Sequence, residues 1–246
     1  MSGVTAIIQA RMGSTRLPGK VLMKLAGRAV IDHVIEHVGA AREIGLIVVA
    51  TTTEAADDVL VDHLSRTDVK VFRGSDADVL SRFEGAARFA GAETIVRVTA
   101  DDPLKDPDVI DRVVSAFGDA NPKCDYVSNT HPPTWPEGQD AEVISVAALF
   151  RAAAETRDPY DREHVTPYFY RNPDKFRCRN IERSPDLSAC RLTLDTPDDF
   201  AFFEAVFAAL DKKGNLIRLP EILDLLDVRP DIAAINVSAE RSAAYR

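Results

Sequence analysis

The first twenty residues decide the fold of this chain: Thr5-Ala6-Ile7-Ile8-Gln9-Ala10 is followed directly by Arg11-Met12-Gly13-Ser14-Thr15-Arg16-Leu17-Pro18-Gly19-Lys20. The first part is an apolar run with the length of a buried strand. The second part is a loop that contains glycines, hydroxyl side chains, two arginines and a lysine. Backbone N–H groups and fixed positive charge of this kind suit a polyanion, so we interpret the stretch as a triphosphate loop.

Each residue type in this loop has its own task under that interpretation. Gly13 and Gly19 let the backbone approach phosphate oxygens or adopt positive φ, and Arg11, Arg16 and Lys20 add charge-assisted hydrogen bonds. The Walker pattern fails, because Lys20 is followed by valine instead of serine or threonine, and the Rossmann glycine triplet is missing. The chemistry of the loop alone also fits an ordinary basic surface turn.

Six ordered blocks resemble a known enzyme family. The opening block, QARMGSTRLPGK (9–20), resembles the signature of the sugar cytidylyltransferases, most closely the spore-coat polysaccharide type, which is similar to the synthetases that activate Kdo and acylneuraminate with CTP. The likeness covers nearly the whole chain. The other blocks are VATTTE (49–54), VFRGSDADVLSRF (71–83), VRVTADDPL (96–104), DREHVTPY (161–168) and RLTLDTPDDF (191–200).

This resemblance implies a fold, an activity and partners. The implied fold is α/β: a Rossmann-like, mostly parallel sheet with helices on both faces, of the nucleotide-diphospho-sugar transferase type. The implied activity transfers CMP from CTP to a sugar or sugar-acid acceptor and releases pyrophosphate, with Mg²⁺ as cofactor, for surface polysaccharide biosynthesis. The resemblance also implies a homodimer.

Length, composition and charge narrow the class further. A chain of 246 residues can bury one substantial core. The net charge of -9 argues against nucleic acid as a partner, because nucleic-acid binders normally show a basic footprint. Apolar runs stay well short of the ~20 residues of a membrane span, and the start of the chain lacks a signal-peptide pattern. Cys124, Cys178 and Cys190 show neither disulfide nor metal-ligand spacing, which indicates free thiols in a reducing compartment. Together these observations predict a cytoplasmic protein without membrane insertion.

The first half of the chain alternates strands and helices in the manner of an α/β sheet. After the opening loop, apolar residues at helical spacing predict a helix over 30–42. Apolar runs predict strands at 46–50, 69–72 and 94–99. Three more helices are expected. One follows Thr53, one covers 76–89, and one begins after Asp106, which is its cap, with Pro107 in its first position.

The second half of the chain departs from this alternation of strands and helices. Residues 121–139 are rich in proline, which predicts a loop with a short strand at 125–128. Further strands are expected at 141–145, 176–181 and 192–194, and helices at 146–155, 163–171 and after Thr196, with Pro197 in the first position. We therefore expect a single domain over 1–246, in which 121–185 form an excursion for acceptor binding and dimerisation.

Two aspartates follow predicted strands. Asp101 comes after strand 94–99 and Asp195 after strand 192–194, and the carboxyl ends of strands line the ligand crevice in open α/β sheets. Magnesium usually takes one or two carboxylates together with substrate phosphates, so Asp101 and Asp195 are the expected metal ligands. Alternatively, each is a turn or cap residue. Asp102 would add negative charge beside the metal.

The nucleotide site is expected to combine the loop with neighbouring strand ends. Arg11, Arg16 and Lys20 would neutralise the leaving pyrophosphate and Asp101 would hold the metal, so these four are the catalytic candidates. No general base is identifiable. The ends of the second and third strands could read the base, or could simply be solvated strand ends and a helix cap. The nucleotide-binding candidates are Gln9, Ala10, Arg11, Gly13, Ser14, Lys20, Thr51, Arg73, Gly74 and Thr99.

The acceptor pocket is expected where the chain departs from the family. A loop that usually begins proline-arginine-threonine and ends glycine-leucine-aspartate has Pro133 in place of the arginine and Gln139 in place of the leucine. This removes one anion contact and adds a neutral donor and acceptor that suits hydroxyls. We therefore expect a hydroxyl-rich or amino sugar rather than a strongly anionic one. The expected walls are Trp135, Gln139, Asp140, Glu142 and His164.

Two other functions remain open at this point. A metal-dependent glycosyltransferase would pair the same kind of sheet with an acidic metal motif, but would take a nucleotide sugar instead of CTP. A non-enzymatic nucleotide-binding regulator could keep the basic loop without needing two convergent carboxylates. A cytidylyltransferase would release pyrophosphate, whereas the glycosyltransferase would not. Any turnover would exclude the non-enzymatic regulator.

Overall fold

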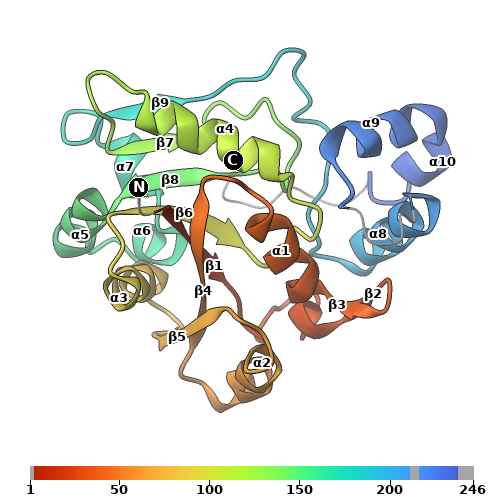
Figure 1. Ribbon diagram of the computed structural model, residues 1–246, viewed down its shortest axis with the longest axis horizontal. Coiled ribbons are helices and arrows are strands. Elements are labelled where there is room, and N and C mark those ends of the chain that lie inside the picture. Colours follow the sequence, from red (N-terminus) through yellow and green to blue (C-terminus); the bar gives the residue numbers. More distant parts are fainter. Residues whose placement is uncertain (1–2, 211–215, 238–246) are drawn as a thin grey trace.

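A seven-stranded sheet forms the centre of the computed structural model, which describes residues 3–210 and 216–237 (Figure 1). Strand β8 runs antiparallel to both of its neighbours, and the other adjacent pairs are parallel. The mostly parallel sheet expected from the sequence is therefore confirmed. The strand order is β5 (Lys70–Gly74), β4 (Ile44–Thr52), β1 (Val4–Gln9), β6 (Thr94–Thr99), β8 (Glu142–Ser145), β7 (Tyr126–Ser128) and β9 (Cys178–Asn180).

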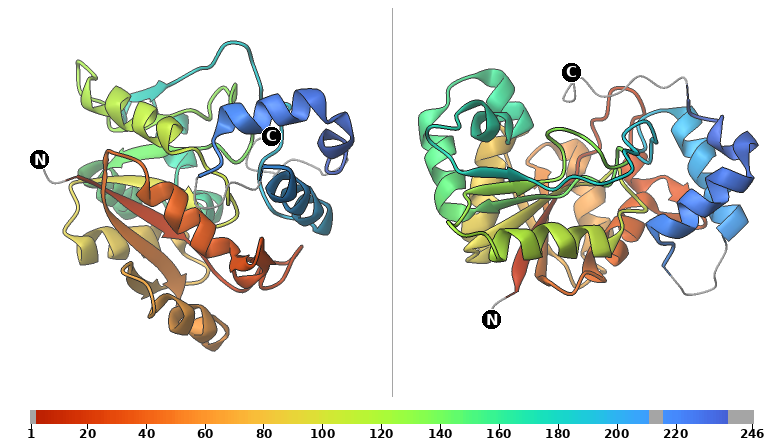
Figure 2. Two further views of the ribbon diagram at one scale, coloured as in Figure 1. Left: turned by 45° about the vertical axis from the view of Figure 1, so that its right-hand side comes forward. Right: turned by 90° about the horizontal axis from the view of Figure 1, so that it is seen from above.

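Helices cover both faces of this sheet, as expected. Successive side chains of a strand point to opposite faces, so Ala6 and Ile8 of β1 pack into one apolar core while Ile7 packs into the other. Figure 2 shows α4 and α5 on opposite sides of the sheet. The first core is covered by α1 (Val30–Gly39), α2 (Asp58–Leu64) and α4 (Pro107–Gly118), and the second by α3 (Val79–Ala90), α5 (Val146–Glu155) and α7 (Pro167–Arg171).

A third apolar cluster lies beside the sheet, where the C-terminal helices gather (Figure 1). Leu25 and Trp135 are buried in it together with Phe203 and Ile222. The start of α8 is as expected, because the Thr196 hydroxyl accepts the backbone N–H of Asp199 at 3.2 Å and Pro197 opens the helix. The elements here are the hairpin β2 (Lys24–Leu25) and β3 (Arg28–Ala29) with helices α8 (Pro197–Leu210), α9 (Leu219–Val228) and α10 (Pro230–Ala233).

Several boundaries differ from the sequence expectation. The segment 163–171 forms two helices, α6 (Pro159–His164) and α7, because Val165 has a φ of 71° that interrupts the helical backbone. Residues 192–194 do not form a strand; in the described chain, pairing there is limited to a single bridge between Glu137 and Arg191. Helix α3 begins later than expected, after a cap in which the side chain of Asp78 accepts the N–H of Ser81 at 2.9 Å.

Other local expectations are confirmed. Asp106 caps α4 by accepting the N–H of Asp108 at 2.8 Å, with Pro107 in the first position. Two short 3-10 helices, η1 (Lys20–Leu22) and η2 (Ala55–Asp57), follow the ends of the opening loop and of β4. In residues 3–210 and 216–237, no helix has both the length and the apolar character needed to cross a membrane.

Candidate active site

A crevice lies at the carboxyl ends of β1 and β6. Gln9, the last residue of β1, pairs with Thr99, the last residue of β6, so the segments that follow both strands leave the sheet at the same edge. Two cavities of about 280 and 210 Å³ open there. They form one crevice, because both are lined by Gln9, Arg16, Arg97, Thr99, Asp101 and His164.

The opening loop is held by its own backbone. The N–H groups of Ser14 and Gly19 both donate to the carbonyl of Met12, each at 3.0 Å. Gly19 has a φ of 71°, a conformation that glycine adopts without steric cost. Asp57 fixes the loop from outside, since its carboxylate accepts the N–H of Met12 at 2.6 Å. This closed loop delivers Lys20 into the crevice at the start of η1.

Lys20 lies between the two aspartates that the sequence predicts as metal ligands. Its Nζ donates to Asp101 Oδ2 at 2.7 Å, to Asp195 Oδ1 at 2.8 Å and to the Leu194 carbonyl at 2.9 Å. Burial acts to lower the pKa of Lys20, but the two carboxylates outweigh it and raise that pKa above its ordinary value. Burial likewise acts to raise the pKa of Asp101, but Lys20 holds it at about 2. Lys20 and Asp101 are therefore both charged at neutral pH.

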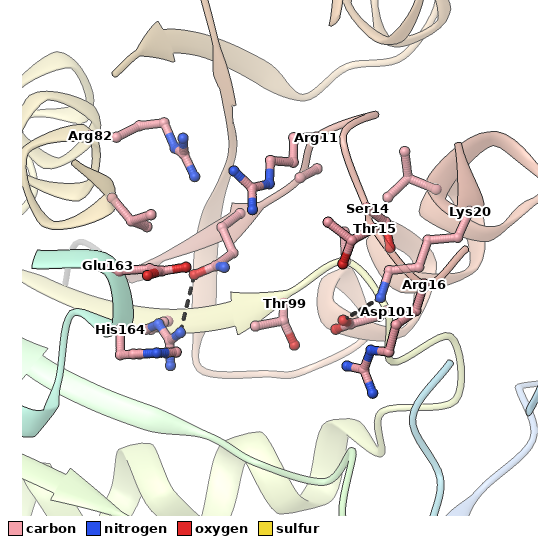
Figure 3. A pocket seen from close by; sticks show the side chains of 16 residues that line it. Arg11, Ser14, Thr15, Arg16, Lys20, Arg82, Thr99, Asp101, Glu163 and His164 are labelled. Atoms are coloured by element: carbon pink, nitrogen blue, oxygen red, sulfur yellow. Dashed lines mark hydrogen bonds and ion pairs between the residues drawn. The ribbon is translucent and has the colours of Figure 1, made fainter. Parts of the chain in front are cut away.

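One end of the crevice, here called the basic cavity, is lined by the opening loop, by Thr99 and Asp101, and by Val79, Arg82 and Glu163 among others. Figure 3 shows Arg11 and Arg82 on one side of it and Lys20 with Arg16 on the other. Arg11 is half exposed and pairs with Asp76 at 2.7 Å. Arg82 is 2% exposed, its guanidinium donates to the Ser75 carbonyl at 2.6 Å, and its Nε has no partner in the described chain. A buried guanidinium without a carboxylate is costly, so this end suits an anion.

The other end, here called the acidic cavity, is lined by carboxylates from several segments. Glu142 pairs with Arg97 and accepts the hydroxyl of Tyr126 at 2.6 Å. Asp102 is buried, and burial raises its pKa to about 6 although Lys105 lies 3.1 Å away. Burial also raises the pKa of Asp140, to about 8. The carboxylates that line this cavity are Asp101, Asp102, Glu137, Asp140, Glu142 and Asp195.

Comparison with known proteins identifies the family. A family model described as "Cytidylyltransferase" matches residues 5–215 of the chain. The chain belongs to the cytidylyltransferase family. It is therefore a nucleotidyltransferase, and the resemblance found in the sequence is confirmed.

Two of its relatives match this cytidylyltransferase over nearly its full length, and a third over about three quarters of it. An uncharacterized protein of Methanocaldococcus jannaschii, MJ1063, is 38% identical over 99% of this chain and 98% of its own. The spore coat polysaccharide biosynthesis protein SpsF of Bacillus subtilis is 32% identical over 95% of this chain and 98% of its own. A 3-deoxy-manno-octulosonate cytidylyltransferase of Bdellovibrio bacteriovorus is 28% identical over 76% of this chain and 70% of its own.

Solved structures confirm the fold of the cytidylyltransferase. A cytidylyltransferase from Leptospira borgpetersenii superposes with a TM-score of 0.90 at 29% identity, covering 98% of this chain and 99% of the other. A CMP:2-keto-3-deoxy-manno-octonic acid synthetase complexed with CTP gives a TM-score of 0.65 at 17% identity, and the match covers 85% of this chain and 99% of the other. The α/β nucleotidyltransferase fold follows from these likenesses.

Most of the expected nucleotide contacts of this cytidylyltransferase lie at the basic cavity. It is lined by Gln9, Ala10, Arg11, Ser14, Lys20 and Thr99, whereas Gly13 is exposed beside it. Thr51, Arg73 and Gly74 lie outside, at the ends of β4 and β5 on the far side of β1. Thr51 is fully buried, and Arg73 is engaged with the carbonyls of Thr52 and Glu54 at 2.8 and 2.9 Å. None of these three residues lines either cavity, and their contact with the nucleotide stays a prediction.

Two of the expected acceptor contacts also lie outside the crevice. Trp135 is 5% exposed, donates its indole N–H to the Ile181 carbonyl at 2.8 Å and packs in the third apolar cluster. Gln139 is fully buried; its amide accepts the N–H of Asp106 at 2.8 Å and donates to the Leu104 carbonyl at 3.0 Å. Both side chains support the cavity wall from behind, so their assignment as acceptor contacts is corrected.

The remaining acceptor candidates line the acidic cavity of the cytidylyltransferase. Asp140 and Glu142 lie on its wall, and His164 lies where it joins the basic cavity. Burial lowers the pKa of His164, so its imidazole is neutral at neutral pH. Arg82 and Glu163 are site residues that the sequence did not single out. Arg82 could have been noticed, because it is the second basic residue of the block 71–83.

Proposed function

We propose that this cytidylyltransferase transfers CMP from CTP to a hydroxyl group of a sugar or sugar acid and releases pyrophosphate. One observation carries the proposal: a basic cavity and an acidic cavity meet where Lys20 lies between Asp101 and Asp195. A triphosphate needs cations and N–H donors, whereas a sugar needs hydrogen-bond acceptors for its hydroxyls. The α-phosphate of CTP would lie at the junction, within reach of both cavities.

The basic cavity would hold the triphosphate. Arg11, Arg16 and Lys20 come from one closed loop and Arg82 comes from α3, so positive charge surrounds the site from two sides (Figure 3). Arg16 is half exposed and pairs with Asp195 at 2.8 Å, which leaves it close to the junction. Preorganised charges aimed at a leaving group stabilise the charge that develops there as the bond to phosphorus breaks. In this scheme the four cations neutralise the departing pyrophosphate.

Asp101 and Asp195 would hold Mg²⁺. They fit such an ion, because their carboxylates come from separate segments and already converge on one cation, the Lys20 ammonium, at 2.7 and 2.8 Å. In the described residues no cluster of three or more acidic, histidine or cysteine side chains forms a complete metal cage. Magnesium commonly binds through one or two carboxylates and completes its shell with substrate phosphates. When bound, it supplies Lewis-acid stabilisation of charge at the phosphate.

The wider role follows the same proposal. SpsF carries spore coat polysaccharide biosynthesis in its name, and we propose a comparable role in surface polysaccharide biosynthesis for this enzyme. We further expect a cytoplasmic homodimer in which residues 121–185 contribute the interface. Light scattering of the purified protein tests the dimer: a monomer at micromolar concentration would contradict it.

Pyrophosphate release tests the proposed reaction. The purified enzyme is incubated with CTP, UTP, ATP or GTP, a panel of sugars and sugar acids, and either Mg²⁺ or EDTA. We expect release only with CTP, an acceptor and Mg²⁺ together. Release of a nucleoside diphosphate from a nucleotide sugar would instead indicate a glycosyltransferase, and CTP binding without any turnover would indicate a regulator.

A further inference from the structure

The carboxylates of the acidic cavity are nearly all paired by the protein itself. Glu142 pairs with Arg97, and Glu137 pairs with Arg191 at 2.9 Å. Asp195 is shared by Lys20, Arg16 and Arg191. Asp102 accepts the hydroxyl of Thr99 at 2.9 Å and pairs with Lys105 at 3.1 Å. Each of these groups has an ion-pair or hydrogen-bond partner in the protein before any ligand binds.

Asp140 is the exception. In residues 3–210 and 216–237 its carboxylate has neither a hydrogen-bond donor nor an ion-pair partner. The nearest cation cannot supply one, because an ammonium has three N–H groups and those of Lys105 are directed to the carbonyls of Gly138 and Asp140 at 2.9 and 2.6 Å and to Asp102. Burial raises the pKa of this carboxyl group to about 8, so it is protonated in the free enzyme at neutral pH. A ligand that brings a donor to it, above all an ammonium group, would stabilise its ionised form.

The same cavity offers little to an anion. Its lining includes two arginines. Arg97 is paired with Glu142, and Arg16 is paired with Asp195 at the junction, where the triphosphate would recruit it. His164 is neutral, because burial lowers its pKa. An acceptor carboxylate placed here would meet no unpaired cation among the lining residues, and it would lie close to the ionised carboxylates of Asp101 and Glu142, whose like charge opposes its binding in a buried site.

We propose that the acidic cavity binds an acceptor that is neutral or carries an ammonium group, that Asp140 receives a hydrogen bond from it, and that sugar acids are disfavoured. This rests on the proposed function, which places the acceptor in that cavity. It separates the enzyme from the 3-deoxy-manno-octulosonate cytidylyltransferases among its relatives, whose acceptor is an acid by name. Neutral and ammonium-bearing acceptors share one feature, a hydrogen-bond donor (O–H or N–H⁺) that can be directed at Asp140.

Three sugars with one ring and different charge test this inference: glucosamine, glucose and glucuronate. Their affinities for the full-length enzyme are measured by ligand-observed NMR titration in the presence of Mg²⁺ and a CTP analogue with a non-hydrolysable α,β-bridge. We expect glucosamine to bind at least roughly tenfold more tightly than glucuronate, with glucose between them, because a charge-assisted hydrogen bond exceeds a neutral one. Failure of glucosamine to bind, or binding of glucuronate as tight as that of glucosamine, would overturn the proposal.

Two variants test whether Asp140 causes the preference for glucosamine over glucuronate. Asp140→Asn should weaken glucosamine binding roughly tenfold and bring the affinities for glucosamine and glucuronate together, since the amide keeps the shape but cannot ionise to pair with the ammonium group. The control is Asp119→Asn, which removes one carboxylate from an exposed position after α4 and should leave all three affinities unchanged. An Asp140→Asn variant that retains the wild-type preference would assign the selectivity elsewhere and overturn the role of Asp140.

The inference and the proposed function fail in different ways. If pyrophosphate is released from CTP but sugar acids are the better acceptors, the function stands and the inference is overturned. If glucosamine binds through Asp140 but no acceptor in either charge class supports pyrophosphate release, the inference about the cavity stands and the proposed reaction is overturned.

Discussion

Lys20 and Asp101 form an ion pair across the crevice, with Nζ 2.7 Å from Oδ2. The same ammonium lies 2.8 Å from Asp195. Lys20 is thus the end of the basic loop and also the counter-charge of both proposed metal ligands. Because two buried carboxylates with no cation between them would repel each other, this lysine contributes to the folded state as well as to the proposed chemistry.

Lys20→Ala should therefore affect both turnover and stability. Removal of one preorganised charge typically costs ~10²-fold or more in rate, so we expect a loss of that size in kcat/KM for pyrophosphate release. Lys20 is only 8% exposed, so the melting temperature should also fall. Lys24→Ala, at an exposed position in β2, is the control. Unchanged turnover in Lys20→Ala would contradict the role of the loop.

The two aspartates are expected to act as a unit. Asp101→Asn and Asp195→Asn should each reduce turnover to background, and the double variant should be little worse than either single one, because groups that share one ion are strongly non-additive. Rates of pyrophosphate release at several Mg²⁺ concentrations provide the measurement. Small losses that add up in the double variant would show that the two carboxylates do not hold the same ion.

Arg82 gives a prediction that separates binding from stability. Arg82→Met keeps an unbranched apolar side chain but removes a buried guanidinium that has no carboxylate partner within residues 3–210 and 216–237. We expect KM for CTP to rise roughly tenfold or more, because a charge-assisted contact to phosphate is lost, while the melting temperature stays the same or rises. Arg88→Met, at an exposed position on the same helix, should change neither. A normal KM for CTP in Arg82→Met would exclude Arg82 from the nucleotide site.

Asp140 predicts a dependence of stability on pH. Burial raises the pKa of this carboxyl group to about 8, near Lys105, Asp102, Glu142 and Glu137. The folded protein therefore retains a proton that the unfolded chain releases near pH 4, so this group makes the free energy of unfolding fall as pH rises from about 4 to about 8. Asp140→Asn should remove that part of the slope and gain on the order of 1 kcal/mol or more over wild type at pH 8.

Urea denaturation of both proteins at a series of pH values measures this difference. At pH 4 the two free energies of unfolding should lie close together, since the carboxyl group is then protonated in the fold. A difference that stays constant across the range, or that favours the wild type increasingly at high pH, would show that Asp140 is ionised and stabilised in the free enzyme.

The sequence predicted the sheet because its strands leave a simple pattern. The apolar residues Ala6, Ile7 and Ile8 occupy consecutive positions, as a parallel strand buried on both faces requires. The convergence of Asp101 and Asp195 was also expected, but partly for a wrong reason. Asp195 reaches the crevice from a segment that forms no strand, and it is held there by the buried side chain of Arg191 at 3.2 Å.

The misplaced contacts have a common cause: strand order and side-chain direction are tertiary properties. Arg73 lies near the end of β5, and β4 separates that strand from β1. Gln139 belongs to the proline-rich loop expected over 121–139. This loop lies against residues 192–193, so close that a Cβ on Gly138 would come within 2.1 Å of the Leu192 carbonyl. The side chain of Gln139 is therefore used to pair buried backbone groups at Leu104 and Asp106.

The most direct test of the central claim is the base preference of pyrophosphate release with Mg²⁺ present. We predict that kcat/KM for CTP exceeds that for UTP at least roughly tenfold, because a site built to pair the exocyclic amine of cytosine leaves polar groups unpaired when uracil replaces it. EDTA should abolish the release. Equal use of UTP, or no pyrophosphate from CTP with any sugar or sugar acid, would contradict the proposed cytidylyl transfer.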